Sequence, residues 1–204
     1  MLCQENKKEK YNMKSTKGID FNTSQTKKNL EQGFSGESQA RNKYTYFAAV
    51  AKKEGYHAIA KVFAETAENE VQHAKLWFKA LGGINGTLDN LKAAAEGENH
   101  EWTDMYKEFA EIAKAEGFDE LALRFQLVGA VERDHEARYA TLAKMLENGT
   151  LFKRDKEIVW ECMNCGHHHK GKEAPQICPT CVHPQGFFFA DCDNYGVEGT
   201  PVKF

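Results

Sequence analysis

Two stretches of the sequence decide the fold: ETAENEVQH, residues 65–73, and VERDHEARY, residues 131–139. Each contains a Glu-x-x-His pair, Glu70 with His73 and Glu132 with His135, within apolar residues spaced by three or four positions. That period predicts amphipathic helices, and the spacing of each pair puts both side chains on one helix face. Because this is the face predicted to be buried, carboxylates and imidazoles stand where apolar side chains are expected.

The helical region repeats itself. A shift of 62 positions places residues 44–73 on residues 106–135 and matches their Tyr, Phe, Ala-Lys, Glu-Gly, Glu and His residues. Two copies of a helical hairpin, related by pseudo-two-fold symmetry, explain the repeat. Breaks at glycines predict helices near 24–53, 56–81, 98–116 and 119–147. We therefore expect a mainly α fold with an antiparallel four-helix bundle at residues 23–147.

Three further carboxylates lie on inward-facing positions of the other two helices, namely Glu37, Glu98 and Glu101. A buried, unpaired carboxylate costs several kcal/mol. Divalent cations would offset five such charges, and mixed oxygen and imidazole ligands suit iron or manganese. One Glu from each of two helices plus Glu-x-x-His from each of the others is the ligand set of di-iron bundles. A metal-free hydrogen-bond network is the alternative, but it fits a single pair better than two pairs in register.

Glu101 has no partner in the internal repeat, unlike the other four carboxylates. Aligning Gly36-Glu37 with Gly97-Glu98 needs a slip of one residue relative to the main repeat, and Glu101 then has no counterpart. We expect it to reach the metal site, with a supporting hydrogen-bond role as the alternative. Tyr44 and Tyr106 share the ligand stripes and could either pack as aromatic core or donate hydrogen bonds to ligand carboxylates.

Four cysteines form two C-x-x-C pairs separated by twelve residues: Cys162, Cys165, Cys178 and Cys181. In a reducing compartment this spacing favours a tetrahedral tetrathiolate site over disulfides. The spacing does not choose between iron and zinc. Residues 158–204 are predicted to form this second, loop-rich domain, and residues 148–157 the linker to it. Cys3 and Cys192 are assigned no role.

Composition excludes several classes of protein. The net charge of −3 argues against a nucleic-acid binder, and no apolar run approaches the length that spans a membrane. Residues 1–22 are predicted to be a flexible leader without the apolar stretch of a secretory signal. We therefore expect a cytoplasmic protein.

The Glu/His pattern of the helical region, followed by the two C-x-x-C pairs, resembles the sequence pattern of the rubrerythrin family. Members of that family have a ferritin-like di-iron domain followed by a rubredoxin-like domain. The resemblance covers residues 13 to about 195. Two residues depart from the pattern: His167 stands where an aromatic residue is usual, and Val182 where glycine is preferred. The segments that carry the resemblance are GESQARNKYTYF, ETAENEVQH, GENHEWTDMY, VERDHEARY, CMNCGH and CPTCVHP.

The resemblance implies a role for each ligand. Glu70 and Glu132 would bridge two irons, and His135 would bind the second iron. His73 and Glu101 would alternate on the first iron with its oxidation state. Glu37 and Glu98 would be terminal ligands.

The resemblance also implies an activity: the reduction of hydrogen peroxide to two waters, with electrons relayed through the tetrathiolate iron. It implies three irons per chain, a homodimer, and an electron donor such as rubredoxin or an NADH-dependent reductase. Zinc stays open as a substitute, because zinc ribbons use the same four cysteine ligands. Two alternatives remain: a ferritin-like protein that oxidises and handles iron, and a zinc-stapled interaction protein.

Overall fold

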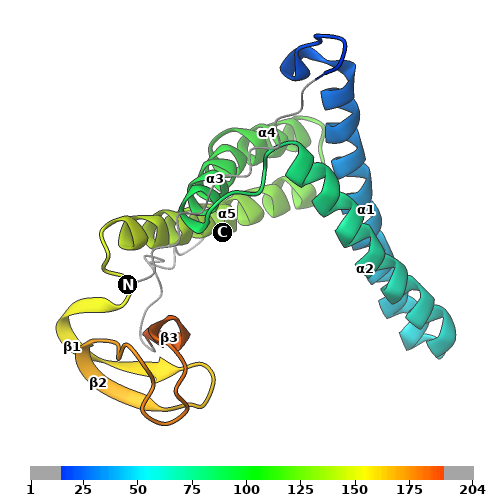
Figure 1. Ribbon diagram of the computed structural model, residues 1–204. Coiled ribbons are helices and arrows are strands. Elements are labelled where there is room, and N and C mark those ends of the chain that lie inside the picture. Colours follow the sequence, from blue (N-terminus) through cyan, green and yellow to red (C-terminus); the bar gives the residue numbers. More distant parts are fainter. Residues whose placement is uncertain (1–14, 191–204) are drawn as a thin grey trace. The chain divides into compact units, whose positions relative to one another are not determined.

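The computed structural model describes residues 15–190, so Cys3 and Cys192 lie outside the described residues. The chain divides into two compact units at Gly86–Thr87, and each is described by itself (Figure 1). No helix among the described residues is both long enough and apolar enough to cross a membrane.

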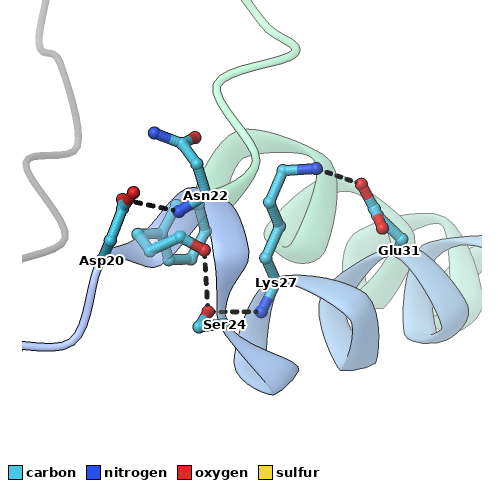
Figure 2. A network of polar contacts seen from close by, with 6 residues as sticks. Asp20, Asn22, Ser24, Lys27 and Glu31 are labelled. Carbon is cyan, nitrogen blue, oxygen red and sulfur yellow. Dashed lines mark hydrogen bonds and ion pairs between the residues drawn. The ribbon is translucent and has the colours of Figure 1, made fainter.

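The first unit is a helical hairpin of α1, Gln25–Lys53, and α2, His57–Ala80, preceded by the short helix η1, Phe21–Thr23. Ser24 begins α1: its Oγ accepts a hydrogen bond from the Lys27 amide at 3.1 Å and donates one to the Phe21 carbonyl at 2.7 Å (Figure 2). Such a cap satisfies an amide that the first helical turn leaves unpaired. Gly55, at a φ of 88°, turns the chain into α2.

Small side chains fill the centre of this hairpin. Its buried residues are all alanines, which permit close approach of the two helices. They are Ala51, Ala60, Ala67 and Ala74.

The second unit begins with three consecutive helical segments: α3, Thr87–His100, the π-helical turn η2, Glu101–Met105, and α4, Tyr106–Ala115. These pack against α5, Asp119–Glu147. The prediction that this helix begins near residue 98 is wrong, since α3 begins at Thr87. Gly97 suggests a break in the sequence, but one glycine inside a helix costs only about 1 kcal/mol. The alanine-rich run before it and the Lys92–Glu147 ion pair to α5 favour the helix.

The second unit ends in a small antiparallel sheet with strand order β2-β1-β3. Its strands are β1, Lys153–Cys162, β2, His168–Glu173, and β3, Phe188–Ala190, with the short helix η3, Gln185–Phe187, before β3. Trp160 is completely buried in its core, and its indole nitrogen donates to the Gly171 carbonyl at 3.1 Å. β1 begins within the segment expected to be the linker.

The ligand stripes differ from the prediction in one respect. Some large apolar side chains on the stripes are exposed within the described chain, and the prediction that these are buried is wrong, whereas others on the same stripes, such as Phe63 and Trp77, are half-buried. Ile59 on α2 is 51% exposed and Leu121 on α5 is 49% exposed. The reason is that each hairpin buries its alanines, which leaves the stripe on an outer face.

Candidate metal centres

The first unit brings together Glu37 from α1 with Glu70 and His73 from α2. One ligand atom from each lies within 4.8 Å of the others. The Nδ1 atom of His73 lies 2.7 Å from the Glu70 carboxylate. Glu70 is largely shielded, with 15% of its side chain exposed, whereas the His73 side chain is 55% exposed. This group offers two carboxylates and one imidazole to a cation, and the side of the group formed by His73 is open to solvent.

The second unit repeats this arrangement with Glu98 from α3 and Glu132 and His135 from α5. Their ligand atoms also lie within 4.8 Å of one another. The Nδ1 atom of His135 lies 2.6 Å from Glu132 and 3.8 Å from Glu98. The sequence repeat is thus matched by a repeat of the side-chain cluster, one in each unit.

Electrostatics in the second group favour a cation. Burial raises the pKa of Glu98 above its usual range, and the neighbouring charge of Glu132 raises it further. The charge of Glu101 acts in the same direction, while His135 opposes it. Carboxylates crowded in this way hold their negative charge less readily, and a bound cation would relieve the repulsion.

Glu101 lies outside both three-residue groups, at the first position of the π-helical turn η2. Its charge, after burial, is the largest cause of the raised pKa of Tyr106, so the carboxylate lies close to that phenol. The π turn explains the one-residue slip in the repeat. Seven residues separate Glu37 from Tyr44, whereas eight separate Glu98 from Tyr106. A helix accommodates one extra residue as a π turn, a distortion frequent at functional sites.

A glycine on α5 makes room for this turn. A Cβ atom at Gly129 would lie 3.3 Å from the Tyr106 Cβ atom and 4.0 Å from the Trp102 Cα atom. The equivalent position in the first unit, 62 residues earlier, is the buried Ala67. The wider turn therefore coincides with the smaller residue opposite it.

Sequence reasoning missed Glu136. Its carboxylate accepts hydrogen bonds from the Asn99 side-chain amide at 3.1 Å and from the Trp102 indole at 2.5 Å. It thereby ties α5 to the end of α3 and to η2. The position next to His135 was the only available signal. Tyr44 contacts Phe47 and Phe63 at ring-centroid distances of 6.3 and 6.2 Å, which fits the aromatic-packing role.

The four predicted cysteines meet in one cluster, and two pairs of their sulfurs are 3.7 Å apart. This distance is too long for a disulfide bond of about 2.05 Å. A tetrahedral ion with bonds of about 2.3 Å would set its sulfurs about 3.8 Å apart. The geometry of Cys162, Cys165, Cys178 and Cys181 therefore fits a tetrathiolate metal site.

The thiols also differ in acidity. A hydrogen bond to Cys181 raises the pKa of Cys165 to about 12. The backbone amide of His183 lowers the pKa of Cys181 to about 6. All four sulfurs can be thiolates together only when a cation balances their charge.

The two cysteine turns share one backbone hydrogen bond but differ in the residue that donates it. In the first turn the Gly166 amide donates to the Cys162 carbonyl, and in the second the Val182 amide donates to the Cys178 carbonyl. Gly166 has a φ of 71°, whereas Val182 adopts the left-handed region with a φ of 62°. A β-branched residue pays a steric penalty there that glycine does not.

Val182→Gly is therefore expected to raise the stability of the small domain by about 1 kcal/mol, since it removes a left-handed conformation that disfavours valine. Thermal unfolding of the metal-loaded protein measures the change. Val159→Gly, on extended backbone in β1, is the control and should destabilise. A loss of stability in Val182→Gly would contradict the assigned strain.

The comparisons with known proteins agree with both sites. The rubrerythrin family model matches residues 28–143, and the model of the rubrerythrin rubredoxin-like domain matches residues 160–189. A rubrerythrin of Porphyromonas gingivalis is 49% identical over 89% of this chain and 95% of that protein. Rubrerythrin-1 of Clostridium acetobutylicum is 46% identical over 90% and 100%, and a rubrerythrin of Nitratidesulfovibrio vulgaris is 44% identical over 86% and 96%. The predicted fold class is confirmed, and the chain belongs to the rubrerythrin family.

Proposed function

We propose that this chain is a non-haem di-iron peroxidase that reduces hydrogen peroxide to water with electrons relayed through its tetrathiolate centre. The observation that carries the proposal is the presence of two Glu/His groups and a four-cysteine cluster in one chain. A ferritin-like protein that oxidises iron needs no electron input and would leave the cysteine cluster without a role. A zinc-stapled interaction protein would leave the Glu/His groups without one.

The reaction consumes two electrons and two protons for each peroxide, breaks the O–O bond and releases both oxygen atoms as water. Two irons bound by the Glu/His groups would supply both electrons, and an iron bound by the cysteines would replace them singly. We therefore propose three irons per chain, with zinc as a substitute in the cysteine site.

The protein side chains hold charge and donate protons around this chemistry. Glu70 and Glu132 are proposed to bridge the two metal positions, with Glu37 and Glu98 as terminal ligands. Tyr106 carries its phenol proton at neutral pH, and burial together with the charge of Glu101 raises its pKa further. It can therefore donate a hydrogen bond to a neighbouring carboxylate.

His73 and Glu101 are proposed to alternate as ligands. Packing encloses neither residue in a regular helix: the His73 side chain is more than half exposed, and Glu101 begins a π turn, where the regular helical hydrogen bonds are interrupted. The first group would then change its donor set with oxidation state while the second keeps His135.

We further propose that the protein works in the cytoplasm as a homodimer that protects against peroxide. An external donor, such as a rubredoxin or an NADH-dependent reductase, would feed the cysteine site. Cys165 is the exposed residue among the four cysteines, and this side of the site is the one proposed to face such a donor.

Metal analysis and an absorption spectrum of the purified protein, followed by addition of peroxide to the reduced form, test the proposal. Three irons per chain and rapid reoxidation by peroxide are expected. Zinc at the cysteines with no response to peroxide would rule the peroxidase out. Reoxidation by oxygen alone, with accumulation of further ferric iron, would favour the ferritin-like alternative.

Glu101→Ala is expected to leave iron binding largely intact, because neither three-residue group includes Glu101. Peroxide turnover should fall by about 10- to 100-fold, the usual cost of losing a group that tunes a metal site. Steady-state turnover and iron content measure the two effects. Glu108→Ala, an exposed carboxylate on α4, is the matched control and should change neither. Unchanged turnover in Glu101→Ala would show that the additional carboxylate has no part in the reaction.

A further inference from the structure

We infer that each carboxylate site is completed by two copies of this chain. The α1–α2 hairpin of one copy supplies Glu37, Glu70 and His73, and the α3–α5 segment of the other supplies Glu98, Glu132 and His135. The reciprocal pair of hairpins forms a second site in the same dimer. This inference rests on the proposed di-iron function and adds which chain provides each half of the site.

The first observation is that both halves expose matching apolar faces. On the α1–α2 hairpin Phe47 is 47% exposed and Ile59 is 51% exposed. Their repeat partners on the second unit, Phe109 and Leu121, are 40% and 49% exposed. Such large side chains in a soluble helical hairpin need a cover, and the faces carry the ligand groups. Each half-site therefore lies on a surface suited to pack against a surface like its own.

The second observation is the length of the connection between the halves. α2 ends at Ala80 and α3 begins at Thr87, so six residues join them. Fully extended, they bridge at most about 25 Å between the Cα atoms of the two helix ends.

This connection is also partly folded. Gly82 has a φ of 76°, and the Gly83 amide donates to the Phe78 carbonyl at 2.9 Å, which closes the end of α2. The Asn85 side-chain amide donates to the Gly82 carbonyl at 3.0 Å. The real reach of the connection is therefore shorter than its extended length.

A ferritin-like bundle contains one long crossover, because the two helices that it joins run parallel. Glu70 lies ten residues before the end of α2, and Glu98 lies eleven residues after the start of α3. At a rise of about 1.5 Å per residue, level ligands on parallel helices would leave the two helix ends about 32 Å apart along the bundle. The six residues cannot cover that distance, so the partner half comes from a second copy.

Exchange between two copies removes the difficulty. The connection then only has to carry α3 away from α2 toward the partner, and the exchanged dimer is closed, with two identical interfaces and no unpaired half. Both apolar faces and all six ligands are used. A short connection is a common cause of such exchange between protomers.

Mixed dimers of differently tagged chains test the inference. The first mixture pairs a chain carrying Glu70→Gln and His73→Gln with a chain carrying Glu132→Gln and His135→Gln. Dimers purified through both tags are loaded with Fe(II), and iron bound outside the cysteine site is counted by metal analysis and absorption. Exchanged halves place both intact groups in one site, so the mixed dimer should hold half the carboxylate-bound iron of the wild type. Each variant alone should hold none.

A second mixture gives the opposite signal. It pairs the wild-type chain with a chain that carries all four substitutions. Exchange puts one damaged half in every site, so the mixed dimer should hold no carboxylate-bound iron. Sites formed within single chains would reverse the two results, with none in the first mixture and half in the second, and this would overturn the inference. A chain that stays monomeric with a full iron complement would overturn it as well.

The iron content of the wild-type protein distinguishes a failure of the exchange inference from a failure of the proposed di-iron function. If wild-type protein binds no carboxylate iron, the di-iron proposal itself is wrong. If it binds iron and the two mixtures give the reversed pattern, only the exchange is wrong. Iron at the four cysteines, which no substitution touches, provides an internal measure of protein loading.

Discussion

Cys178→Ser is expected to abolish peroxide reduction that depends on an external electron donor. Cys178 is 1% exposed, and its sulfur lies 3.7 Å from that of Cys165 in the four-sulfur cluster. Replacing one thiolate by a hydroxyl weakens the tetrahedral site, and the relay of single electrons is lost with its metal. Removing a residue that only hydrogen-bonds to a metal ligand costs up to about 100-fold in activity. Because Cys178 is itself a proposed ligand, donor-supported turnover should fall by at least that factor.

The same variant should retain the peroxide chemistry of the carboxylate site. Protein reduced chemically beforehand, without any donor, should still consume peroxide once per pair of ferrous ions. A single-turnover experiment measures this, and Met163→Ser, an exposed position between the first two cysteines, is the matched control. Donor-supported turnover at the wild-type rate in Cys178→Ser would contradict the relay.

Trp160→Ala is expected to destabilise the small domain by about 3 to 5 kcal/mol, the usual cost of removing a fully buried large aromatic side chain. The Trp160 ring is completely buried among Cys162, Ala174 and Phe188. Its indole also donates a hydrogen bond, and the Arg154 guanidinium lies 5.2 Å from its centre. Since so small a core depends on its metal, the loss should be enough to unfold the metal-free domain.

Thermal unfolding with and without bound metal measures the effect. Val159→Ala is the matched control, because Val159 is the neighbouring residue of β1 and is 40% exposed. It should change stability by no more than about 0.5 kcal/mol. Equal destabilisation by both variants would show that the ring is not the centre of this core.

Much of the site was predictable because its signal is local. A Glu-x-x-His pair lies on one helix face whatever the helix packs against, and a C-x-x-C turn directs two sulfurs to one point. The clusters around Glu70 and Glu132 therefore follow from spacing, as does the convergence of Cys162 with Cys165 in one turn.

The features that could not be predicted depend on tertiary context. The helical state of residues 87–97 depends on packing against α5, which outweighs the glycine that suggested a break. The one-residue slip near Glu101 was visible in the sequence, but a loop, a bulge or a shifted helix would explain a slip equally well. The π turn is found where Tyr106 lies close to Gly129 on α5, a tertiary neighbour that the local sequence does not reveal.

The exposure of the ligand stripes was unpredictable for another reason. Periodicity identifies which face of a helix is apolar, but not which chain covers it. Phe47 and Phe109 fit the expected pattern and remain exposed within the described chain. That difference between pattern and burial is the basis for placing a second copy on these faces.

Rapid mixing of the fully reduced protein with hydrogen peroxide tests the central claim, that the cysteine site passes electrons to the carboxylate site. We expect the ferric tetrathiolate absorption to return quickly in the wild type, and far more slowly in a variant with Glu132→Gln and His135→Gln, whose cysteine site is intact. Peroxide would then oxidise the cysteine iron only through the carboxylate site. Equal rates in the two proteins would contradict the claim, because peroxide would be reacting with the cysteine iron directly.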